Sequence, residues 1–230
     1  MTDIDKIIEQ ANKLDHKVEV LSSIKSGKEA TVYKVLLDGN LVAMKVYKKP
    51  EERSYKNTGE YLAGRYYRSP SQKRVIVKNN RFAKKLKHES WVKREYYMLE
   101  SLFDSGAIIP RPILLIDDAI FMELLGNMSN VASRLYDVKL EKSEAEKAFI
   151  SVLNSVEIFW NYGIVHADLS EFNLLWWKSK PYIIDFPQSI DRRTHPNSKE
   201  LLNRDLENVV KYFSRYIEID LNEVKSRFDE

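Results

Sequence analysis

A short passage in the last third of the chain places polar residues between apolar segments. Residues 165–186 read VHADLSEFNLLWWKSKPYIIDF. LLWW and YIIDF have the composition of two paired strands, with Asp168 and Asn173 in the loop before them and Asp185 at their end. Carboxylate and amide oxygens are ligands that divalent cations prefer. The passage predicts a unit that gathers two Asp and one Asn, and the alternative is a polar turn in an ordinary sheet.

The spacing inside this passage is that of a phosphoryl-transfer site. His166, Asp168 and Asn173 occur at the offsets of the kinase signature H-R-D-L-x-x-x-N, with Ala167 in place of Arg, and Asp185 follows as a metal-motif Asp. Phosphoryl transfer needs a carboxylate that accepts the proton of the acceptor group. It also needs oxygen ligands that hold Mg²⁺ against the phosphates. We therefore expect an ATP-dependent phosphotransferase.

Composition limits the class of protein. The chain has 230 residues, of which 43% are hydrophobic and 31% charged, which suits one large domain or two small lobes. It has no Cys and four scattered His, which exclude disulfides and do not favour a zinc site. The N-terminal sequence MTDIDKIIEQ does not resemble a signal peptide, and no segment is apolar enough to span a bilayer. We expect a cytoplasmic protein that does not bind membranes.

The formal net charge of +3 conceals an uneven distribution. Residues 45–100 contain sixteen Lys and Arg against six Asp and Glu, a local net charge of +10. A run of nearly one sign is more than an ordinary solvated face, and it favours a polyanionic partner. The partner is either the phosphates of a nucleotide or a nucleic acid.

The N-terminal part predicts a helix followed by a hairpin. Apolar residues at three- and four-residue steps predict an amphipathic helix over residues 3–21, so residues 1–22 form an N-terminal helical element. The segments TVYKVLL and LVAMKVY flank Asp38-Gly39-Asn40, a strong hairpin signal. They belong to a β-rich lobe over residues 23–125.

Two sequence segments in this lobe point to phosphates. Ser26, Gly27 and Lys28 lie where a kinase has its Gly-rich loop, although only the middle Gly of the template is present. VAMK matches the kinase motif V-A-I-K and ends in Lys45. A Lys in an apolar strand needs an anionic partner. We expect Lys45 to contact the α- and β-phosphates of ATP and a helix glutamate.

The helix that supplies this glutamate begins near Ser90. Glu95 is the preferred partner of Lys45, and Glu89 and Glu100 are weaker alternatives. The segment before the helix, about residues 50–87, is a basic insertion whose aromatic and Arg side chains could stack on bases. Partial helix is expected at residues 61–67 and 80–87.

The rest of the chain follows the kinase order. Strands are expected at residues 113–116 and 119–122, after which Met122 guards the adenine pocket and the backbone of Glu123 and Leu125 pairs with adenine. A helix over residues 143–162, with Gly163 as its C-cap, then leads to the catalytic loop. Only 45 residues follow Asp185, with one strong helix over residues 199–215. Residues 126–230 therefore form a reduced helical lobe that cannot build a platform for a peptide substrate.

With these motifs in place, the chain resembles the RIO family of atypical serine protein kinases, and within it the Rio1-like branch in a minimal, archaeal-type form. The resemblance covers residues 23–213. It rests on SGKEATVYKV, VAMKVYK, MELLG, VHADLSEFN, YIIDFPQS and THPNSKELLNRDLENVVKYF. The segments IDFPQ and THPN depart from that branch and are more similar to the winged-helix branch.

The resemblance implies an α+β, bilobal, protein-kinase-like fold that binds ATP with Mg²⁺ or Mn²⁺. It makes Asp168 the catalytic base and Asn173 and Asp185 the metal ligands, with Lys45 on the phosphates. In Rio1-like members the residue equivalent to Asp185 can itself accept the phosphoryl group, which gives an ATPase cycle.

The resemblance also implies a role in maturation of the small ribosomal subunit, with residues 45–100 as the surface for rRNA or the particle. The alternatives are a small-molecule phosphotransferase with a kinase-like fold and a nucleotide-gated binding switch with little transfer activity.

Overall fold

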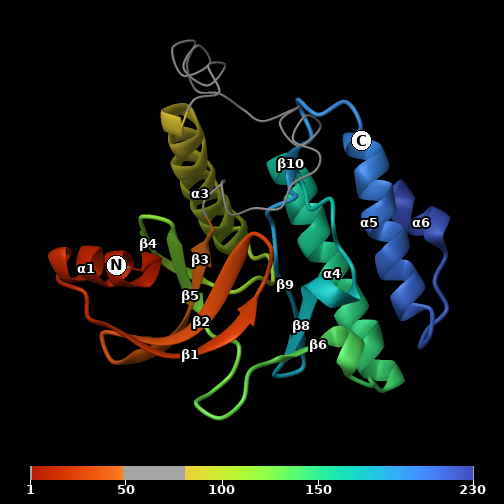
Figure 1. Cartoon of the computed structure of the whole chain (residues 1–230). Coiled ribbons are helices and arrows are strands. Elements are labelled where there is room, and N and C mark those ends of the chain that lie inside the picture. Colours follow the sequence, from red (N-terminus) through yellow and green to blue (C-terminus); the bar gives the residue numbers. More distant parts are fainter. Residues whose placement is uncertain (1, 49–80, 230) are drawn as a thin grey trace. The chain divides into compact units, whose positions relative to one another are not determined.

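The computed structural model describes residues 2–48 and 81–229 (Figure 1). Most of the predicted basic insertion, including the expected helix at residues 61–67, lies outside these residues. The described residues divide into two compact units, and most residue–residue contacts lie within one unit or the other. The first unit contains residues up to 48, residues 81–100 and Arg111–Val131, and the second contains Ser101–Pro110 and residues from 132 on. The last segment of the second unit begins at Ala132. The lobes expected at residues 23–125 and 126–230 stay a prediction.

The first unit is built on an antiparallel sheet of five strands in the order β1-β2-β3-β5-β4. The strands are β1 (Val18–Ser26), β2 (Ala30–Leu37), β3 (Asn40–Tyr47), β4 (Pro112–Ile116) and β5 (Ala119–Glu123). The predicted hairpin is confirmed, because β2 pairs with β3 up to Leu37 and Asn40. Asp38 and Gly39 form its turn with φ of 51° and 80°. Positive φ at both central residues is typical of the type I′ turn, whose backbone twist matches that of the two strands it joins.

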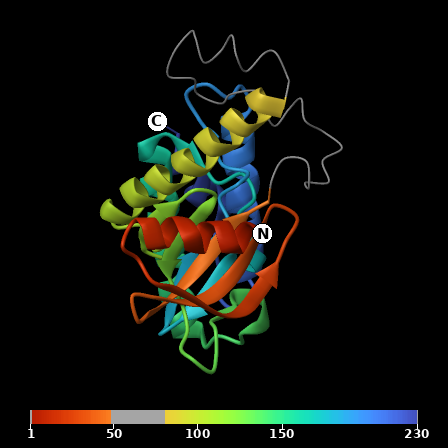
Figure 2. The ribbon, with the colours of Figure 1, turned by 60° about the vertical axis from the view of Figure 1, so that its left-hand side comes forward.

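Helix α1 (Asp3–Lys13) lies across one face of this sheet, as Figure 2 shows. Its buried residues Ile7 and Ala11 join a core cluster with Val42, Met44 and Phe121. Side chains of a strand alternate between its two faces. Val42 and Met44 therefore face α1, while Ala43 and Lys45 face the other side of the sheet.

The N-terminal helix is shorter than predicted. The expectation of a helix over residues 3–21, within an element at residues 1–22, is wrong, because the helix ends at Lys13 and strand β1 begins at Val18. Asp15 has a left-handed φ of 60°, which breaks the helix. The segment VEVLSSIKS then has the β-branched residues that are typical of a strand. The helical periodicity of the preceding residues was extended over the start of this strand in the prediction.

Helix α3 (Arg81–Asp104) contains the glutamate-bearing helix that was expected from residue 90, and it starts earlier. It therefore includes most of the expected helix at residues 80–87. Val92, Met98 and Leu102 are buried, whereas Tyr97 is 60% exposed, so Met98 and not Tyr97 belongs to its apolar face. Gly106, with φ of 88°, lies in the turn that follows the helix.

The second unit combines helices with short strands. Its helices are α4 (Lys142–Tyr162), α5 (Ser198–Phe213) and α6 (Leu221–Ser226), with the 3-10 turns η3 (Leu135–Asp137) and η4 (Glu171–Asn173). Its strands are β6 (Ser133–Arg134), β7 (Ile164–Val165), β8 (Leu174–Trp177), β9 (Lys180–Ile183) and β10 (Ile190–Asp191). Gly163 ends α4 in a left-handed conformation with φ of 89°, as the sequence predicts.

The strand before Asp185 ends earlier than expected. The segment YIIDF was predicted to be a strand, but β9 stops at Ile183. Asp185 has φ of 72°, a left-handed value that a strand cannot contain. None of the described helices is long and apolar enough to cross a membrane.

Candidate functional site

Lys45 and Glu95 form the ion pair that the sequence predicts. Lys45 Nζ on β3 lies 3.1 Å from Glu95 Oε1 on α3, and the two side chains are only 12% and 4% exposed. The hydroxyl of Tyr47, on the same face of β3, donates to the same oxygen at 2.6 Å. Trp91 of α3 packs edge-on against the Tyr47 ring. That Lys45 contacts ATP phosphates stays a prediction.

Tyr47 acts here as a neutral donor. Burial, together with the negative charge of Glu95, raises the pKa of Tyr47 well above its usual range. The phenol therefore keeps its proton and holds the carboxylate of Glu95 toward Lys45. The sequence did not predict this role of Tyr47, because an aromatic residue in a strand indicates an ordinary core position.

Ser26 ends strand β1, and Gly27 and Lys28 follow it in the turn before β2. The Gly27 N–H donates to the carbonyl of Ala30 at 2.8 Å, and Lys48 Nζ donates to the Gly27 carbonyl at 2.7 Å. A Cβ atom at Gly27 would lie 3.3 Å from the Ala30 oxygen, so Gly fits this tight turn best. Lys28 is exposed. Lys48 thus stabilises the turn.

The predicted adenine-binding residues lie at the end of β5. Met122 and Glu123 close the strand, and Leu125 follows at 4% exposure. The chain then turns sharply at Gly126, where a Cβ atom would lie 2.5 Å from the Asn130 carbonyl oxygen. The segment that would carry adenine contacts is thus followed by a turn that only Gly allows.

Lys34 stabilises the turn that begins at Gly126. It is 8% exposed, and its Nζ donates to the Met128 carbonyl at 2.8 Å. A buried ammonium group needs such a partner. Lys34 pairs with Ala43 in the sheet, so it lies on the same face as Lys45. Like Lys45, Lys34 is a Lys in an apolar strand, which indicates a need for a polar partner. This argument was used to predict a partner for Lys45 only.

In the second unit, Asp168 and Asn173 are brought together as predicted from their spacing. Asn173 Nδ2 donates to the backbone carbonyl of Asp168 at 2.8 Å and to its Oδ2 at 3.2 Å. Asp168 is exposed, whereas Asn173 is 9% exposed. The Ile184 N–H donates to the Asn173 carbonyl at 3.0 Å. The chain therefore carries Asp185, the next residue, to the end of the loop that holds Asp168 and Asn173.

The loop that carries Asp168 is held by Asp205 of α5. The N–H groups of Ala167 and Leu169, on either side of Asp168, donate to the two Asp205 carboxylate oxygens at 2.7 and 2.9 Å. Arg204 donates to the Ala167 carbonyl, and Asn208 Nδ2 donates to the Leu169 carbonyl at 3.0 Å. Three side chains from two consecutive turns of α5 therefore fix both flanks of Asp168.

This clamp forces a strained backbone. Ala167 has φ of 63°, a left-handed value that costs a non-Gly residue about 1–2 kcal/mol. His166, 2% exposed, donates from Nε2 to the Ile184 carbonyl at 3.1 Å, and its ring packs against Phe186. His166 thus ties the catalytic loop to the segment that carries Asp185. It has a structural place in the site and no exposure to a substrate.

Asp205 was missed by sequence analysis, although a signal was present. It is 1% exposed and stands between Leu202 and Leu206 on the apolar side of α5. A carboxylate on an apolar helix face needs hydrogen-bond donors. Burial raises the pKa of Asp205, while the charge of His166 and the two backbone N–H groups act in the opposite direction.

The oxygen donors of this loop fit Mg²⁺. Since Asn173 directs its amide nitrogen at Asp168, its oxygen is the atom left for a cation. Asn173 and Asp185 then offer one amide and one carboxylate oxygen, and Mg²⁺ is usually held by one or two carboxylates with water and phosphates completing its shell. No cluster of three His, Cys, Asp or Glu suited to a metal occurs among the described residues. A site that shares its metal with phosphates does not need one.

Comparison with known proteins shows the fold and the family of this chain. The solved complex of Rio2 kinase with ADP, Mg²⁺ and phosphoaspartate from Chaetomium thermophilum superposes with a TM-score of 0.62 at 20% identity, over 96% of this chain and 65% of that one. The fold is therefore α+β and protein-kinase-like. The profile of the RIO domain matches residues 31–225. The chain belongs to the RIO family.

Two of its relatives are Rio1 kinases. Serine/threonine-protein kinase rio1 of Schizosaccharomyces pombe is 34% identical over 201 residues, which are 86% of this chain and 38% of that protein. RIO-type serine/threonine-protein kinase Rio1 of Haloferax volcanii is 31% identical over 195 residues, which are 84% of this chain and 62% of that protein. The chain is thus similar to Rio1 kinases and spans less than two thirds of the length of either relative.

Replacement of Asp205 tests the clamp. Asp205→Ala leaves two buried N–H groups without acceptors, at about 1–3 kcal/mol each, so the free energy of unfolding should fall by about 2–6 kcal/mol. Denaturant titration measures this change. Because the folded-state pKa of Asp205 is raised, its contribution is greatest below the usual carboxyl range and shrinks as pH rises through the raised pKa. The deficit of the variant should therefore grow on acidification.

Asp104→Ala is the matched control for this experiment, since Asp104 is exposed at the end of α3 and should change stability by less than about 0.5 kcal/mol. Equal stability of the two variants would contradict the clamp.

Proposed function

We propose that the chain is an ATP-dependent phosphotransferase of the RIO serine/threonine kinase type, with ATPase activity. The observation that carries the proposal is the contact of Asp168 with Asn173 on a loop that Asp205 holds, at the end of the segment leading to Asp185. One loop thus offers a proton acceptor and oxygen ligands for a metal. Phosphoryl transfer requires little more of the protein than this positioning.

The first unit supplies the nucleotide contacts in this proposal. Lys45, held by Glu95, contacts the α- and β-phosphates, as a charged group that is already desolvated and oriented. The backbone of Glu123 and Leu125 pairs with adenine, and Met122 borders its pocket. The turn before β2 adds contacts to the phosphates in this proposal. Ser26 and Lys28 supply side-chain donors, and Gly27 allows the tight turn between them.

The second unit supplies the metal ligands and the base. Bound Mg²⁺, or Mn²⁺, supplies charge neutralisation at the phosphate oxygens. Asn173 and Asp185 hold it through their side-chain oxygens. Asp168, exposed and fixed in orientation by Asn173, accepts the proton of the attacking hydroxyl or water.

Asp185 has a second role in the proposal, which the phosphoaspartate named in the Rio2 complex supports. A carboxylate oxygen of Asp185 attacks the γ-phosphorus, the bond between γ-phosphorus and the bridging oxygen breaks, and ADP leaves with the bond electrons. Water then attacks the phosphorus of the aspartyl phosphate. Asp168 accepts a proton of that water, phosphate is released, and the Asp185 carboxylate is regenerated.

Turnover of ATP tests the role of Asp168. Asp168→Ala should lower kcat by about 100-fold or more, the usual contribution of a positioned general base. Hydrolysis is measured by phosphate release at saturating Mg·ATP, with Asp104→Ala as the control that should keep wild-type activity. Negligible hydrolysis by the wild type would favour a nucleotide-gated switch, and an unchanged kcat in Asp168→Ala would contradict the assignment.

A covalent adduct tests the role of Asp185. After incubation with ATP labelled at the γ-phosphate, the wild type should retain acid-stable label that hydroxylamine removes, because hydroxylamine cleaves acyl phosphates. Asp185→Ala should retain none. Asp118→Ala, which removes a carboxylate from the β4–β5 turn, serves as control and should label normally. Label that persists in Asp185→Ala would exclude this residue as the acceptor.

The proposed cytoplasmic partner is the small ribosomal subunit or its rRNA, contacted through the basic residues 45–100. The family resemblance and the local net charge of +10 support this partner. Cosedimentation with small subunits should occur at about 50 mM salt and fall steeply by about 200 mM, as counterion release requires. Absence of association at the lower salt would refute the ribosomal partner without affecting the assignment of the ATP site.

A further inference from the structure

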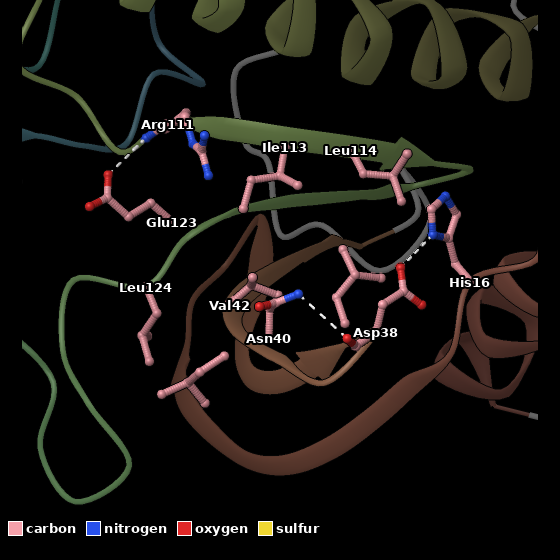
Figure 3. Close-up of a pocket in the computed structure, with 11 residues that line it drawn as sticks. His16, Asp38, Asn40, Val42, Arg111, Ile113, Leu114, Glu123 and Leu124 are labelled. Atoms are coloured by element: carbon pink, nitrogen blue, oxygen red, sulfur yellow. Dashed lines mark hydrogen bonds and ion pairs between the residues drawn. The ribbon is translucent and has the colours of Figure 1, made fainter.

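A cavity of about 460 Å³ lies in the first unit on the side of the sheet that α1 covers (Figure 3). Its walls come from the ends of β2, β3, β4 and β5, and apolar side chains dominate them. The principal ones are Leu41, Val42, Ile113, Leu114 and Leu124. Cavities of this size and character are those that bind small organic molecules.

The cavity exists because α1 stops short. The helix ends at Lys13 and the chain turns at Asp15, so that no helix of the described residues lines the cavity beyond His16. Ile113 and Leu114 pack against the core cluster but stay only partly buried. The same break that shortened the predicted helix therefore leaves an apolar surface open at this end of the sheet.

The cavity does not coincide with the predicted adenine contacts. Val42 pairs with Glu123 in the sheet, and Ala43 pairs with Met122. Paired residues share a face, and neighbours along a strand point to opposite faces. Val42 and Glu123 line the cavity, so Met122 and Ala43 face away from it.

Two pairs of ionisable residues border the cavity, His16 with Asp38 and Arg111 with Glu123. They differ in whether their charged groups contact each other. At one end, His16 Nδ1 and the Lys17 N–H both lie 2.7 Å from carboxylate oxygens of Asp38. These bonds lower the pKa of Asp38, so its charge is fully engaged.

At the other end the guanidinium of Arg111 is available. Glu123 directs Oε2 at the backbone N–H of Arg111, 3.3 Å away, and not at its side chain. The Arg111 guanidinium forms no ion pair with a residue in the described part of the chain, and in Figure 3 it extends beside the apolar wall that includes Ile113.

We propose that this cavity is a binding site for a small amphipathic organic anion. The apolar body of the ligand lies against the β3, β4 and Leu124 side chains, and its carboxylate, sulfonate or phosphate group accepts hydrogen bonds from Arg111. Guanidinium is suited to this role, because it presents several donors in a fixed plane and stays charged at any physiological pH.

The cavity and the proposed nucleotide site share the segment at Glu123 and Leu124, a consequence that rests on the proposed function. Glu123 and Leu124 line the cavity, while the backbone of Glu123 and Leu125 is the predicted adenine contact. A ligand that shifts this segment changes affinity for ATP, and ATP changes affinity for the ligand by the same factor. The cavity is thus an allosteric site in this account.

Binding of 8-anilinonaphthalene-1-sulfonate, an aromatic anion that fluoresces in apolar sites, tests the proposal. The dye should bind the wild-type chain with one site per molecule, and Arg111→Met should weaken it about tenfold or more, the loss expected for a charge-assisted hydrogen bond. The uncharged N-phenyl-1-naphthylamine has the same aromatic body without the sulfonate. Its affinity should be equal in both proteins, which also shows that the variant keeps the cavity.

Lys93→Met, which removes an exposed cation from α3 of the same unit, is the control and should bind the dye like the wild type. Equal dye affinity in Arg111→Met, or no saturable binding to the wild type, would overturn the proposal. Rising Mg·ATP should shift the dye affinity to a plateau, whereas an unlimited decline means competition in the nucleotide site and also overturns it. If ATP does not bind at all, the proposed function fails while the Arg111 comparison still decides this inference.

Discussion

The carboxylate of Asp205 is the group on which the geometry of the second unit depends. It accepts hydrogen bonds from the N–H groups on both sides of Asp168, so one helix side chain determines where the loop runs. The bonds hold Ala167 in a left-handed conformation that it would not adopt alone. The strain, the burial of a carboxylate and the approach of Asn173 to Asp168 are consequences of the same arrangement. The exposed Asp168 is therefore presented by a backbone that cannot relax.

The first unit solves a similar problem with a buried cation. Lys45 is desolvated, and Glu95 supplies the opposite charge that makes its burial tolerable. Tyr47 adds a neutral donor to the same carboxylate oxygen, so the position of Glu95 is set by two contacts. A phosphate that reached Lys45 would meet a cation already stripped of water and fixed in direction. Preorganisation of charge is thus common to both units.

The sequence predicted the parts of the site whose signals are local. Spacing was sufficient to place Asp168 beside Asn173, and a Lys in an apolar strand was sufficient to predict its ion pair with Glu95. The αL cap at Gly163 and the hairpin at Asp38 and Gly39 followed from backbone chemistry. These features depend on residues that are close in sequence or on a charge that must be neutralised.

What the sequence did not predict depends on distant partners or on single backbone angles. Asp205 accepts hydrogen bonds from residues almost forty positions earlier, and the residues around it in the sequence do not indicate which donors it would contact. The early ends of α1 and β9 follow from left-handed conformations at Asp15 and Asp185, which apolar periodicity does not register. The clamp and the early ends of α1 and β9 therefore needed the structure. The contact of Asp168 with Asn173 and the ion pair of Lys45 with Glu95 did not.

A crystal structure of the chain with Mg²⁺ and a non-hydrolysable ATP analogue tests the central claim most directly. The account predicts that Lys45 Nζ lies within hydrogen-bond distance of the α- or β-phosphate while it keeps Glu95, and that Asn173 and Asp185 both ligate the metal. A nucleotide bound away from Lys45, or a metal held without Asp185, would contradict it.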